Sequence, residues 1–348
     1  MDINHSFYQL TPDSILNAIE SLGYETTGRF YPLNSVENRV YDIETSNSGR
    51  IVVKFYRPGK WSYEEILEEH KFLSELSLNE IPVLTPIEIK GKTLFEWSGI
   101  YFAIWPLRNG RIVEEIAGRD LERVGALIGR IHSVGKRLSS LHRPMLDIPS
   151  YGLKSLNFIL ENHLIQNNSL AERYKATALR SFEIFESLVK EYKIPFQRIH
   201  GDCHKGNLLI SQDGFSILDF DDFLTGPIVQ DFWMLLPLGE DDQKSDLFQF
   251  LQGYTMFADF DENWLQLVEP LRIVRYVHYA AWIAKRWKDP SFPSLFPHFG
   301  TEEYWLKETL DLESAKKDLE GHSFDKSNNL EDAEPEMTNK DFFWDWEN

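Results

Sequence analysis

The secondary-structure pattern of this chain changes near residue 106. Before this point the chain has short runs rich in β-branched and aromatic residues, which predict strands: ETTGRFYPL, NRVYDIET, RIVVKFYR, TLFEW and IYFAIW. After it, helical periodicity dominates. Strand runs followed by helix runs are typical of an α+β fold. We therefore expect a bilobal molecule with a small β-rich N-lobe and a larger helical C-lobe.

The length of 348 residues is compatible with two lobes, because single hydrophobic cores stop growing near about 250–300 residues. We place the N-lobe at residues 1–106, the C-lobe at 107–321 and a tail at 322–348. The tail is acidic and polar apart from its terminal DFFWDWEN. Such a composition predicts a mobile segment.

Local signals place several elements. Thr11 followed by Pro12 is typical of a helix start, and Ser62 with Glu65 three residues later predicts a capping box. The polar turn at residues 46–49 predicts a hairpin. In the C-lobe we expect one β segment, LLI followed by FSILDF. Helices are expected at 118–136, 172–191, 229–237, 244–257, 262–287 and 302–319.

Composition excludes several classes of function. The net charge of −19 repels phosphate backbones, so we expect no nucleic-acid partner. The single cysteine, Cys203, cannot form an intramolecular disulfide, which favours a reducing compartment. No apolar stretch of about 18 residues and no signal-peptide pattern occur, so we expect a soluble cytoplasmic protein without a membrane partner. No coiled-coil pattern is present, and we expect a monomer.

The strongest chemical signal is HGDCHKGNLLI followed by FSILDFDD. Asp202 and Asn207 are five residues apart, and Asp219 follows twelve residues after Asn207. Phosphoryl transfer from ATP needs a carboxylate that orients the attacking hydroxyl and oxygen ligands for Mg²⁺. A loop followed by two hairpin strands brings these groups together. The pattern predicts a kinase that uses ATP and Mg²⁺.

A second requirement of kinase chemistry is a strand lysine paired with a helix glutamate. Lys54 lies in the expected strand RIVVKFYR. Glu69 falls on the apolar face of the helix that begins after Ser62, where a charge needs a partner. Glu68 points about 100° away and is the second choice.

The loop HGDCHKGN resembles that of the aminoglycoside phosphotransferase and choline kinase superfamily, HGDxHxxN. By this resemblance Asp202 is the catalytic base, Asn207 is a metal ligand, and Asp219 is the principal metal ligand and a second catalytic residue. Asp231, in GPIVQDFW, then supports the catalytic loop.

A narrower resemblance covers most of the chain, from about Leu33 to Pro293. The segments LNSVENRVY, VVKFYRP, ILEEH, HGDCHKGN, GPIVQDFWML, EPLRIVRYVHYAAW and RWKDPSFP resemble the bacterial stress response kinase A (YihE) family. This resemblance implies a cytoplasmic Ser/Thr protein kinase linked to stress survival, with a protein substrate whose identity is open. It also implies that Ser35 contacts ATP. No GxGxxG loop precedes Lys54, so we expect the loop at 34–38 to cover the phosphates.

Other functions remain open at this point. A small-molecule kinase acting on an amino alcohol, a sugar or an aminoglycoside would use the same ATP site. A pseudokinase is disfavoured by the intact Lys54, Asp202, Asn207 and Asp219. A metal-dependent phosphatase is disfavoured because no nucleophilic Asp follows a first strand.

Several nearby residues have simpler interpretations. His200 is expected to orient the loop through a hydrogen bond, and Cys203 to be a small packed residue. Asp221 and Asp222 are expected to face solvent or to bond within the loop, with a second Mg²⁺ as the alternative. The helix at 262–287 is expected to pack one face in the core and to expose a basic face to solvent. Alternatively, three of its side chains line an acceptor groove: Arg272, Arg275 and Tyr279.

Overall fold

The computed structural model describes residue 7 and residues 10–33, 35–236 and 243–320, and the expected mobile tail at 322–348 lies outside them. The described chain forms two compact units that are not continuous in sequence. Unit 1 comprises Met1–Val113, Ser140–Arg143 and Asn207–Phe223, and unit 2 comprises the rest. The expected lobe boundary at residues 106 and 107 stays a prediction.

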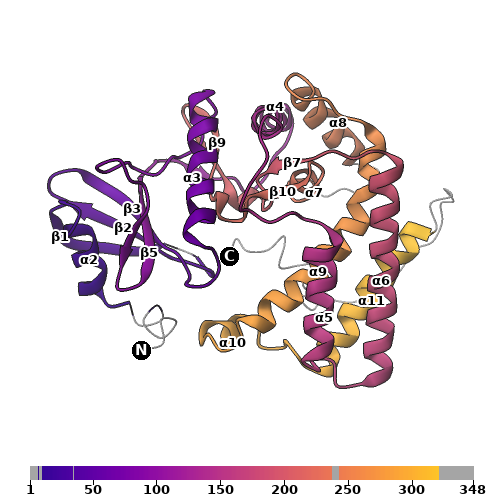
Figure 1. The fold of residues 1–348 in the computed structure, drawn as a ribbon. Helices are drawn as coiled ribbons and strands as arrows, with labels where there is room; N and C mark the ends of the chain where they lie inside the picture. The colour runs from indigo at the N-terminus through magenta and orange to yellow at the C-terminus, as the bar shows by residue number, and fades with distance from the viewer. Residues whose placement is uncertain (1–6, 8–9, 34, 237–242, 321–348) are drawn as a thin grey trace. The chain divides into compact units, whose positions relative to one another are not determined.

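Unit 1 is built on a five-stranded antiparallel sheet with the strand order β1-β2-β3-β5-β4 (Figure 1). Its strands are β1 (Thr26–Leu33), β2 (Arg39–Thr45), β3 (Gly49–Phe55), β4 (Phe95–Trp97) and β5 (Ile100–Pro106). Two helices accompany the sheet, α2 (Pro12–Glu20) and α3 (Tyr63–Leu78). All five strands and both helix starts correspond to segments expected from the sequence.

The two faces of this sheet carry different cores. Val53 and Phe55 of β3 pack in a cluster with Ile15 and Ile19 of α2. Ala103 of β5 packs on the opposite face with a cluster that includes Ile66 of α3. Side chains alternate between faces along a strand, so the residue between Val53 and Phe55 points toward α3. That residue is Lys54.

The helix caps explain where α2 and α3 begin. The Thr11 hydroxyl accepts a hydrogen bond from the backbone N–H of Ser14. Ser62 and Glu65 form the expected reciprocal capping box, in which each side chain bonds the backbone N–H of the other residue. These caps satisfy N–H groups that otherwise have no partner within the helix.

Unit 1 also contains a small sheet in the order β6-β8-β9, of which β8 and β9 come from the second half of the chain. Its strands are β6 (Arg111–Ile112), β8 (Leu208–Ser211) and β9 (Gly214–Ile217), and the 3₁₀ turn η3 (Phe220–Asp222) follows. A parallel bridge joins Val83 to Ile217 and attaches this hairpin to the N-terminal part of the unit. The hairpin β8–β9 was expected, whereas β6 was not.

Unit 2 is mainly helical, and α5, α6, α9 and α11 pack against one another in it (Figure 1). Its α-helices are α4 (Arg119–Gly135), α5 (Lys154–Glu161), α6 (Asn168–Glu191), α7 (Gln230–Trp233), α8 (Gln243–Tyr254), α9 (Val268–Lys285), α10 (Ser291–Leu295) and α11 (Glu302–Glu320). Shorter elements are the π-helix η1 (Ile148–Leu153), the 3₁₀ turn η4 (Glu262–Leu267), and the strand pair β7 (Phe196–Ile199) and β10 (Leu224–Pro227). The 3₁₀ turn η2 (Lys205–Asn207) spans the boundary, because its last residue belongs to unit 1.

Some expectations for this region were wrong. The helix expected at 262–287 is a 3₁₀ turn up to Leu267, and the α-helix starts at Val268. Pro270 accounts for this start, because proline lacks the N–H that an earlier α-helical turn would need and is tolerated in the first turn. The helix α5 was missed, as was the strand pair β7–β10, and α7 ends at Trp233 rather than at residue 237, which is outside the described residues.

Among the helices in the described part of the chain, none is both long enough and apolar enough to cross a bilayer.

Candidate active site

Lys54 is surrounded by three carboxylates in unit 1. Its Nζ lies 2.9 Å from Asp221 Oδ1, 3.1 Å from Asp219 Oδ1 and 3.8 Å from Glu69 Oε1. The lysine side chain is 9% exposed, and it enters this group from the central strand β3. The structure therefore brings together the lysine, the helix glutamate and the hairpin aspartate that the sequence analysis selected.

Burial and charge act in opposite directions on this cluster. Burial by itself lowers the pKa of Lys54, but Asp219, Asp221 and Glu69 outweigh it and hold the pKa well above the ordinary value. Burial raises the pKa of Glu69 to about 7, although Lys54 opposes the shift. The cluster therefore contains a permanent cation and a glutamate that titrates near neutral pH.

Glu69 and Glu68 have distinct roles. Glu69 is buried on the same face of α3 as Ile66 and Leu73, as its helical spacing predicted. The carboxylate of Glu68 instead accepts hydrogen bonds from three consecutive backbone N–H groups at 2.6, 2.8 and 2.9 Å; these belong to Leu141, His142 and Arg143. Glu68 thus anchors the returning segment at 140–143, and Glu69 is the partner of Lys54.

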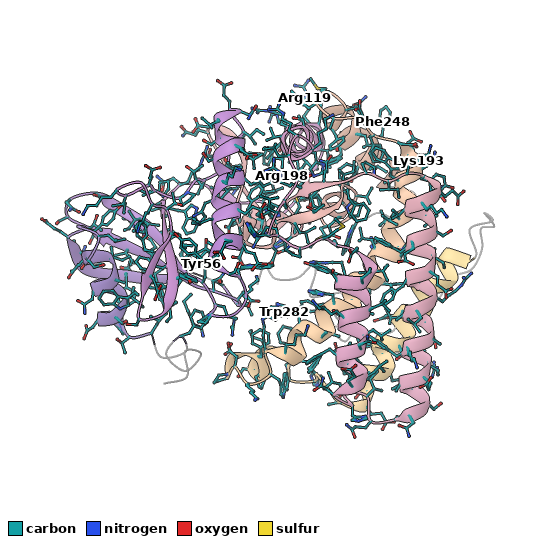
Figure 2. All side chains as sticks on the ribbon, in the orientation of Figure 1. Tyr56, Arg119, Lys193, Arg198, Phe248 and Trp282 are labelled. Atoms are coloured by element: carbon teal, nitrogen blue, oxygen red, sulfur yellow. The ribbon has the colours of Figure 1, made fainter. Side chains whose placement is uncertain are left out.

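The aromatic surroundings of Lys54 include Tyr56, which is labelled in Figure 2 and whose ring centroid lies 4.9 Å from Lys54 Nζ. The Tyr56 hydroxyl is 3.0 Å from His70 Nε2, and His70 Nδ1 is 2.8 Å from the Thr93 hydroxyl. Burial lowers the pKa of His70 to about 3, and the charges of Lys54 and Arg143 add to this effect. The imidazole is therefore neutral and adds no charge to the cluster.

Asn207 and Asp219 are joined through the β8–β9 hairpin. Leu208 pairs with Ile217, and the N–H of Leu218 donates to the carbonyl of Asn207 at 2.8 Å. Asp219 follows directly, in a left-handed conformation with φ 54° and ψ 68°. Its side chain is 54% exposed. The hairpin thus holds Asn207 beside the residue that precedes Asp219 and leaves the Asp219 carboxylate accessible.

Asp221 is more deeply embedded than expected. Its side chain is 5% exposed, its Oδ1 forms an ion pair with Lys54 Nζ, and its Oδ2 lies 2.7 Å from Lys60 Nζ and 3.2 Å from Asn38 Nδ2. The expectation that Asp221 faces solvent was wrong, because two buried lysines from β3 and from the segment before α3 converge on it. The two ammonium groups outweigh burial and hold the pKa of Asp221 well below its ordinary value.

Ser35 lies in the loop expected to cover the phosphates, at its described end. The Ser35 hydroxyl accepts a hydrogen bond from the N–H of Asn38 at 3.2 Å, and Asn38 Oδ1 accepts from the N–H of Arg57 at 3.1 Å. Asn38 also donates a hydrogen bond to Asp221, so one buried amide connects the loop to the segment after β3 and to the segment after β9.

Asp202 lies in unit 2, in a loop held by buried hydrogen bonds. Asp231 is fully buried, and its carboxylate accepts hydrogen bonds from the backbone N–H groups of His200 and Gly201, both at 2.9 Å. The imidazole of His200 accepts from the N–H of Asp202 at 3.3 Å. The expected roles of Asp231 and His200 as supports of this loop are confirmed. Cys203 is buried, and burial raises its pKa well above the ordinary value, as a packed thiol requires.

Two further residues support this loop or meet Asp202. His132 of α4 lies 2.9 Å from Asp231 Oδ2 and 3.0 Å from the hydroxyl of Tyr254. Arg275 of α9 places Nη2 3.4 Å from Asp202 Oδ1. Two interpretations of Arg275 were open from the sequence, and no spacing rule links this residue to Asp202, 73 positions away. His132 carried no signal that the sequence analysis used.

The candidate residues divide between the two units. Ser35, Lys54, Glu69, Asn207 and Asp219 belong to unit 1. Asp202 belongs to unit 2, and the chain passes from unit 2 to unit 1 between Gly206 and Asn207. Within unit 1 the arrangement supplies a buried cation and accessible carboxylate and amide oxygens, and within unit 2 it supplies a carboxylate on a rigid loop.

Comparison with known proteins gives a consistent result. Residues 30–267 match the model of the phosphotransferase enzyme family. The chain is 38% identical to stress response kinase A of Escherichia coli (strain K12), over 89% of this chain and 94% of the relative. It is 37% identical to serine/threonine protein kinase RdoA of Salmonella typhimurium, over 87% of this chain and 92% of the relative.

The fold agrees with these relatives. The solved structure of amicoumacin kinase hAmiN in complex with AMP-PNP, Ca²⁺ and Ami superposes with a TM-score of 0.67 at 18% identity. The match covers 93% of this chain and 97% of the amicoumacin kinase. The chain therefore has the expected α+β kinase-like fold and belongs to the phosphotransferase enzyme family and, within it, to the stress response kinase A family.

Proposed function

We propose that this chain is an ATP-dependent Ser/Thr protein kinase that transfers the γ-phosphoryl group in line to a hydroxyl, in the cytoplasm. The observation that carries the proposal is the cluster around Lys54, in which one buried ammonium contacts Glu69 and Asp219 from separate elements. A lysine held in this way is poised to bind the α- and β-phosphates of ATP. The identity of the RdoA relative as a serine/threonine protein kinase supports a protein acceptor.

The donor set fits Mg²⁺. Asp219 offers an accessible carboxylate, and Asn207 offers an amide oxygen at the adjoining hairpin end. In the described part of the chain no three His, Cys, Asp or Glu side chains form a metal site by themselves. Magnesium commonly uses one or two protein oxygens together with substrate phosphates, so this sparse set is the expected one. When bound by Asn207 and Asp219, the metal would neutralise charge on the β- and γ-phosphates.

Each remaining residue has one role in the proposal. Lys54, kept in place by Glu69, binds the α- and β-phosphates, and Ser35 contacts the nucleotide from the covering loop. Asp202 accepts a hydrogen bond from the acceptor hydroxyl and orients it for attack. His200 and Asp231 hold the backbone on either side of Gly201, so that Asp202 keeps its position without reorganisation.

The test is transfer of ³²P from [γ-³²P]ATP with Mg²⁺, to a general protein substrate and to a panel of amino alcohols, sugars and aminoglycosides. We expect label on Ser or Thr of the protein. Asp202→Ala should lower kcat by at least about a hundredfold without unfolding the chain, because it removes the group that orients the nucleophile.

The outcomes separate the alternatives. Label on a small molecule alone would make this a metabolite kinase with the same nucleotide site. Full activity of Asp202→Ala would show that Asp202 is not the base. Nucleotide binding with no transfer to any acceptor would favour a pseudokinase.

A further inference from the structure

One face of α9 carries a stripe of four side chains that begins at the proposed base. Arg275, Tyr279 and Trp282 of α9 and its C-cap residue Arg286 are spaced by four, three and four residues, which places them within about 60° of one another around the helix axis. All four are partly exposed. The residues between them are mostly buried; these include Val277, Ala280, Ala281 and Ile283. The stripe therefore lies on the partly exposed face of an otherwise packed helix, with the Arg275 side chain 11% exposed.

Arg275 contacts the proposed base, and the other three members of the stripe contact one another. Arg275 Nη2 lies 3.4 Å from Asp202 Oδ1. The rings of Tyr279 and Trp282 are stacked at 5.3 Å with an interplanar angle of 10°. The guanidinium of Arg286 lies 4.7 Å from the centroid of the Trp282 ring. Trp282, labelled in Figure 2, also packs against Phe292 of α10 at 5.0 Å, which fixes its ring.

The far end of the stripe is positively charged. Lys285 is exposed beside Arg286. Partial burial lowers the pKa of Lys285, and the charges of Arg286 and Lys154 lower it further. Three cations thus act on one another at this end of α9, in a chain whose net charge is −19. A local excess of one charge on a surface of the opposite sign attracts ligands of complementary charge.

We propose that this stripe, Arg275, Tyr279, Trp282 and Arg286, is the acceptor subsite of the kinase and that it selects peptides carrying an acidic side chain at a fixed distance from the phosphorylated hydroxyl. The inference rests on the proposed function, because it takes Asp202 as the residue that meets the hydroxyl.

The length of the stripe sets that distance. From Arg275 to Arg286 the helix rises by about 16 Å, at about 1.5 Å per residue. An extended peptide covers about 3.3 Å per residue, so its acidic side chain should lie about five residues from the Ser or Thr. The partly exposed Tyr279 and Trp282 side chains between the two ends offer apolar contacts to an aromatic side chain of the peptide.

The same chemistry disfavours cationic small-molecule acceptors. Arg275 stands directly beside Asp202, and an ammonium group held close to the reacting hydroxyl would be repelled by it. A short amino alcohol bound at Asp202 also cannot reach Arg286. The stripe therefore favours the peptide acceptor over the amino-alcohol alternative.

The experiment is a peptide scan with the full chain, Mg²⁺ and ATP. Each peptide carries one Ser in an alanine- and glycine-based sequence, with a single Glu placed from one to eight residues before or after it. We expect kcat/KM to be roughly five- to tenfold higher for Glu about five residues away on one side than for the peptide without Glu.

The charge-reversed variant Arg286→Glu should lose this preference and favour Lys at the same peptide position. Arg286→Gln should lose the preference for Glu without gaining one for Lys. This variant is included because a charge reversal at residue 286 can disturb the end of α9. Arg119→Glu is the matched control, because Arg119 is an exposed arginine at the start of α4 (Figure 2). It should retain the Glu preference.

Melting temperatures of all variants are measured, since cations near a helix C-terminus also stabilise the helix. Phosphorylation of all peptides at one rate, unchanged by Arg286→Glu, would overturn the acceptor subsite and leave the kinase proposal standing. Failure of the wild-type chain to label any peptide or protein would overturn the proposed function itself.

Discussion

Asp219 combines an accessible carboxylate with a backbone conformation that few residues adopt. Its φ of 54° lies in the left-handed region, where Asp and Asn are tolerated better than most side chains. Such positions persist where surrounding contacts fix them, and they concentrate at functional sites. Here the fixing contact is the hydrogen bond from the preceding N–H, of Leu218, to Asn207. The conformation and the chemistry of Asp219 can therefore be separated by mutation.

Asp219→Asn keeps the residue type that the backbone tolerates and removes the charge. We expect kcat/KM with Mg·ATP to fall by about a hundredfold or more, because the principal metal ligand is lost. The free energy of unfolding should change by less than about 1 kcal/mol, since the side chain is half exposed and Lys54 keeps two other carboxylates. Phosphoryl-transfer kinetics and urea denaturation test this. Unchanged kinetics at low Mg²⁺ would contradict the assignment.

Glu69 predicts a pH dependence of stability. Its pKa is about 7 in the folded chain, whereas an exposed glutamate has a pKa of about 4.3. The folded state therefore binds more protons than the unfolded state between these values. The stabilising contribution of the protonated group is fully present below pH about 4.3 and is lost as pH rises toward 7.

Glu69→Gln should remove this contribution to the pH profile. We expect the free energy of unfolding of the wild type, relative to that of Glu69→Gln, to fall from pH 5 to pH 8. Urea denaturation across this range, without nucleotide, measures the difference. Glu64→Gln is the control, because Glu64 is exposed on the same helix. Parallel profiles for the wild type and Glu69→Gln would contradict the raised pKa.

At the residue scale the sequence predicted some partners and not others. Glu69 was preferred over Glu68 because the helical spacing places it on the same face as the buried apolar residues of α3. Such local periodicity can be detected in a sequence. The burial of Asp221 was not predictable, because it depends on Lys54 and Lys60 converging from positions more than 150 residues away. Arg275 was undetermined for the same reason. Pairings at long range are set by the fold and leave no local pattern.

At the scale of elements, α4 and α8 approach so closely that glycine is required at their contact. A Cβ on Gly253 of α8 would lie 1.8 Å from the carbonyl oxygen of Glu122 on α4. Reciprocally, a Cβ on Gly125 of α4 would lie 2.0 Å from the carbonyl oxygen of Phe250. Backbone atoms cannot move aside as a flexible side chain can, so the two helices would have to separate.

We therefore expect Gly253→Ala to destabilise the chain by roughly 1–3 kcal/mol. The direction of the change in stability is informative, because Gly→Ala at an exposed position inside a helix stabilises by about 1 kcal/mol. The neighbouring Gln252→Ala, at an exposed position, should stay within about 0.5 kcal/mol of the wild type. Chemical denaturation followed by far-UV circular dichroism measures both. A gain in stability for Gly253→Ala would show that the helices do not touch here.

Elements with strong local signals were predictable, and short elements were not. The caps at Thr11 and Ser62 fixed two helix starts, and alternation identified the strands of the main sheet. The pair β7–β10 has four residues in each strand and pairs residues 25 to 31 positions apart, which gives little periodicity to detect. The missed helix α5 follows directly from a π-helical turn and lacks a side-chain cap.

At the scale of the whole molecule, the sequence predicted the order of β-rich and helical parts but not the grouping of segments. Asn207–Phe223 belongs to unit 1, although the rest of that unit comes from the first 143 residues. Its pairing with β6 and its bridge to Val83 join segments more than 95 residues apart. Unit 1 is consequently incomplete in any N-terminal fragment, and measurements on the nucleotide site require the full chain.

Nucleotide binding should therefore be visible as a change in the stability of the intact chain. A ligand that binds only the folded state stabilises it by about 2.7 kcal/mol at a hundred times its Kd. For a chain of this size we expect Mg·ATP to raise Tm by roughly 5–10 °C. ATP with EDTA should give a smaller rise, because Lys54 still binds the phosphates while Asn207 and Asp219 have no metal to hold.

Two variants test whether the rise in Tm comes from nucleotide bound at the Lys54 cluster. In Asp219→Asn the Tm with Mg·ATP should fall to the value seen with ATP and EDTA, whereas Lys54→Met should abolish both rises. Differential scanning fluorimetry over a range of nucleotide concentrations measures these shifts. An equal rise with and without Mg²⁺ in the wild type would remove the metal from the proposal. A rise that survives Lys54→Met would place the nucleotide away from the cluster on which the proposed function depends.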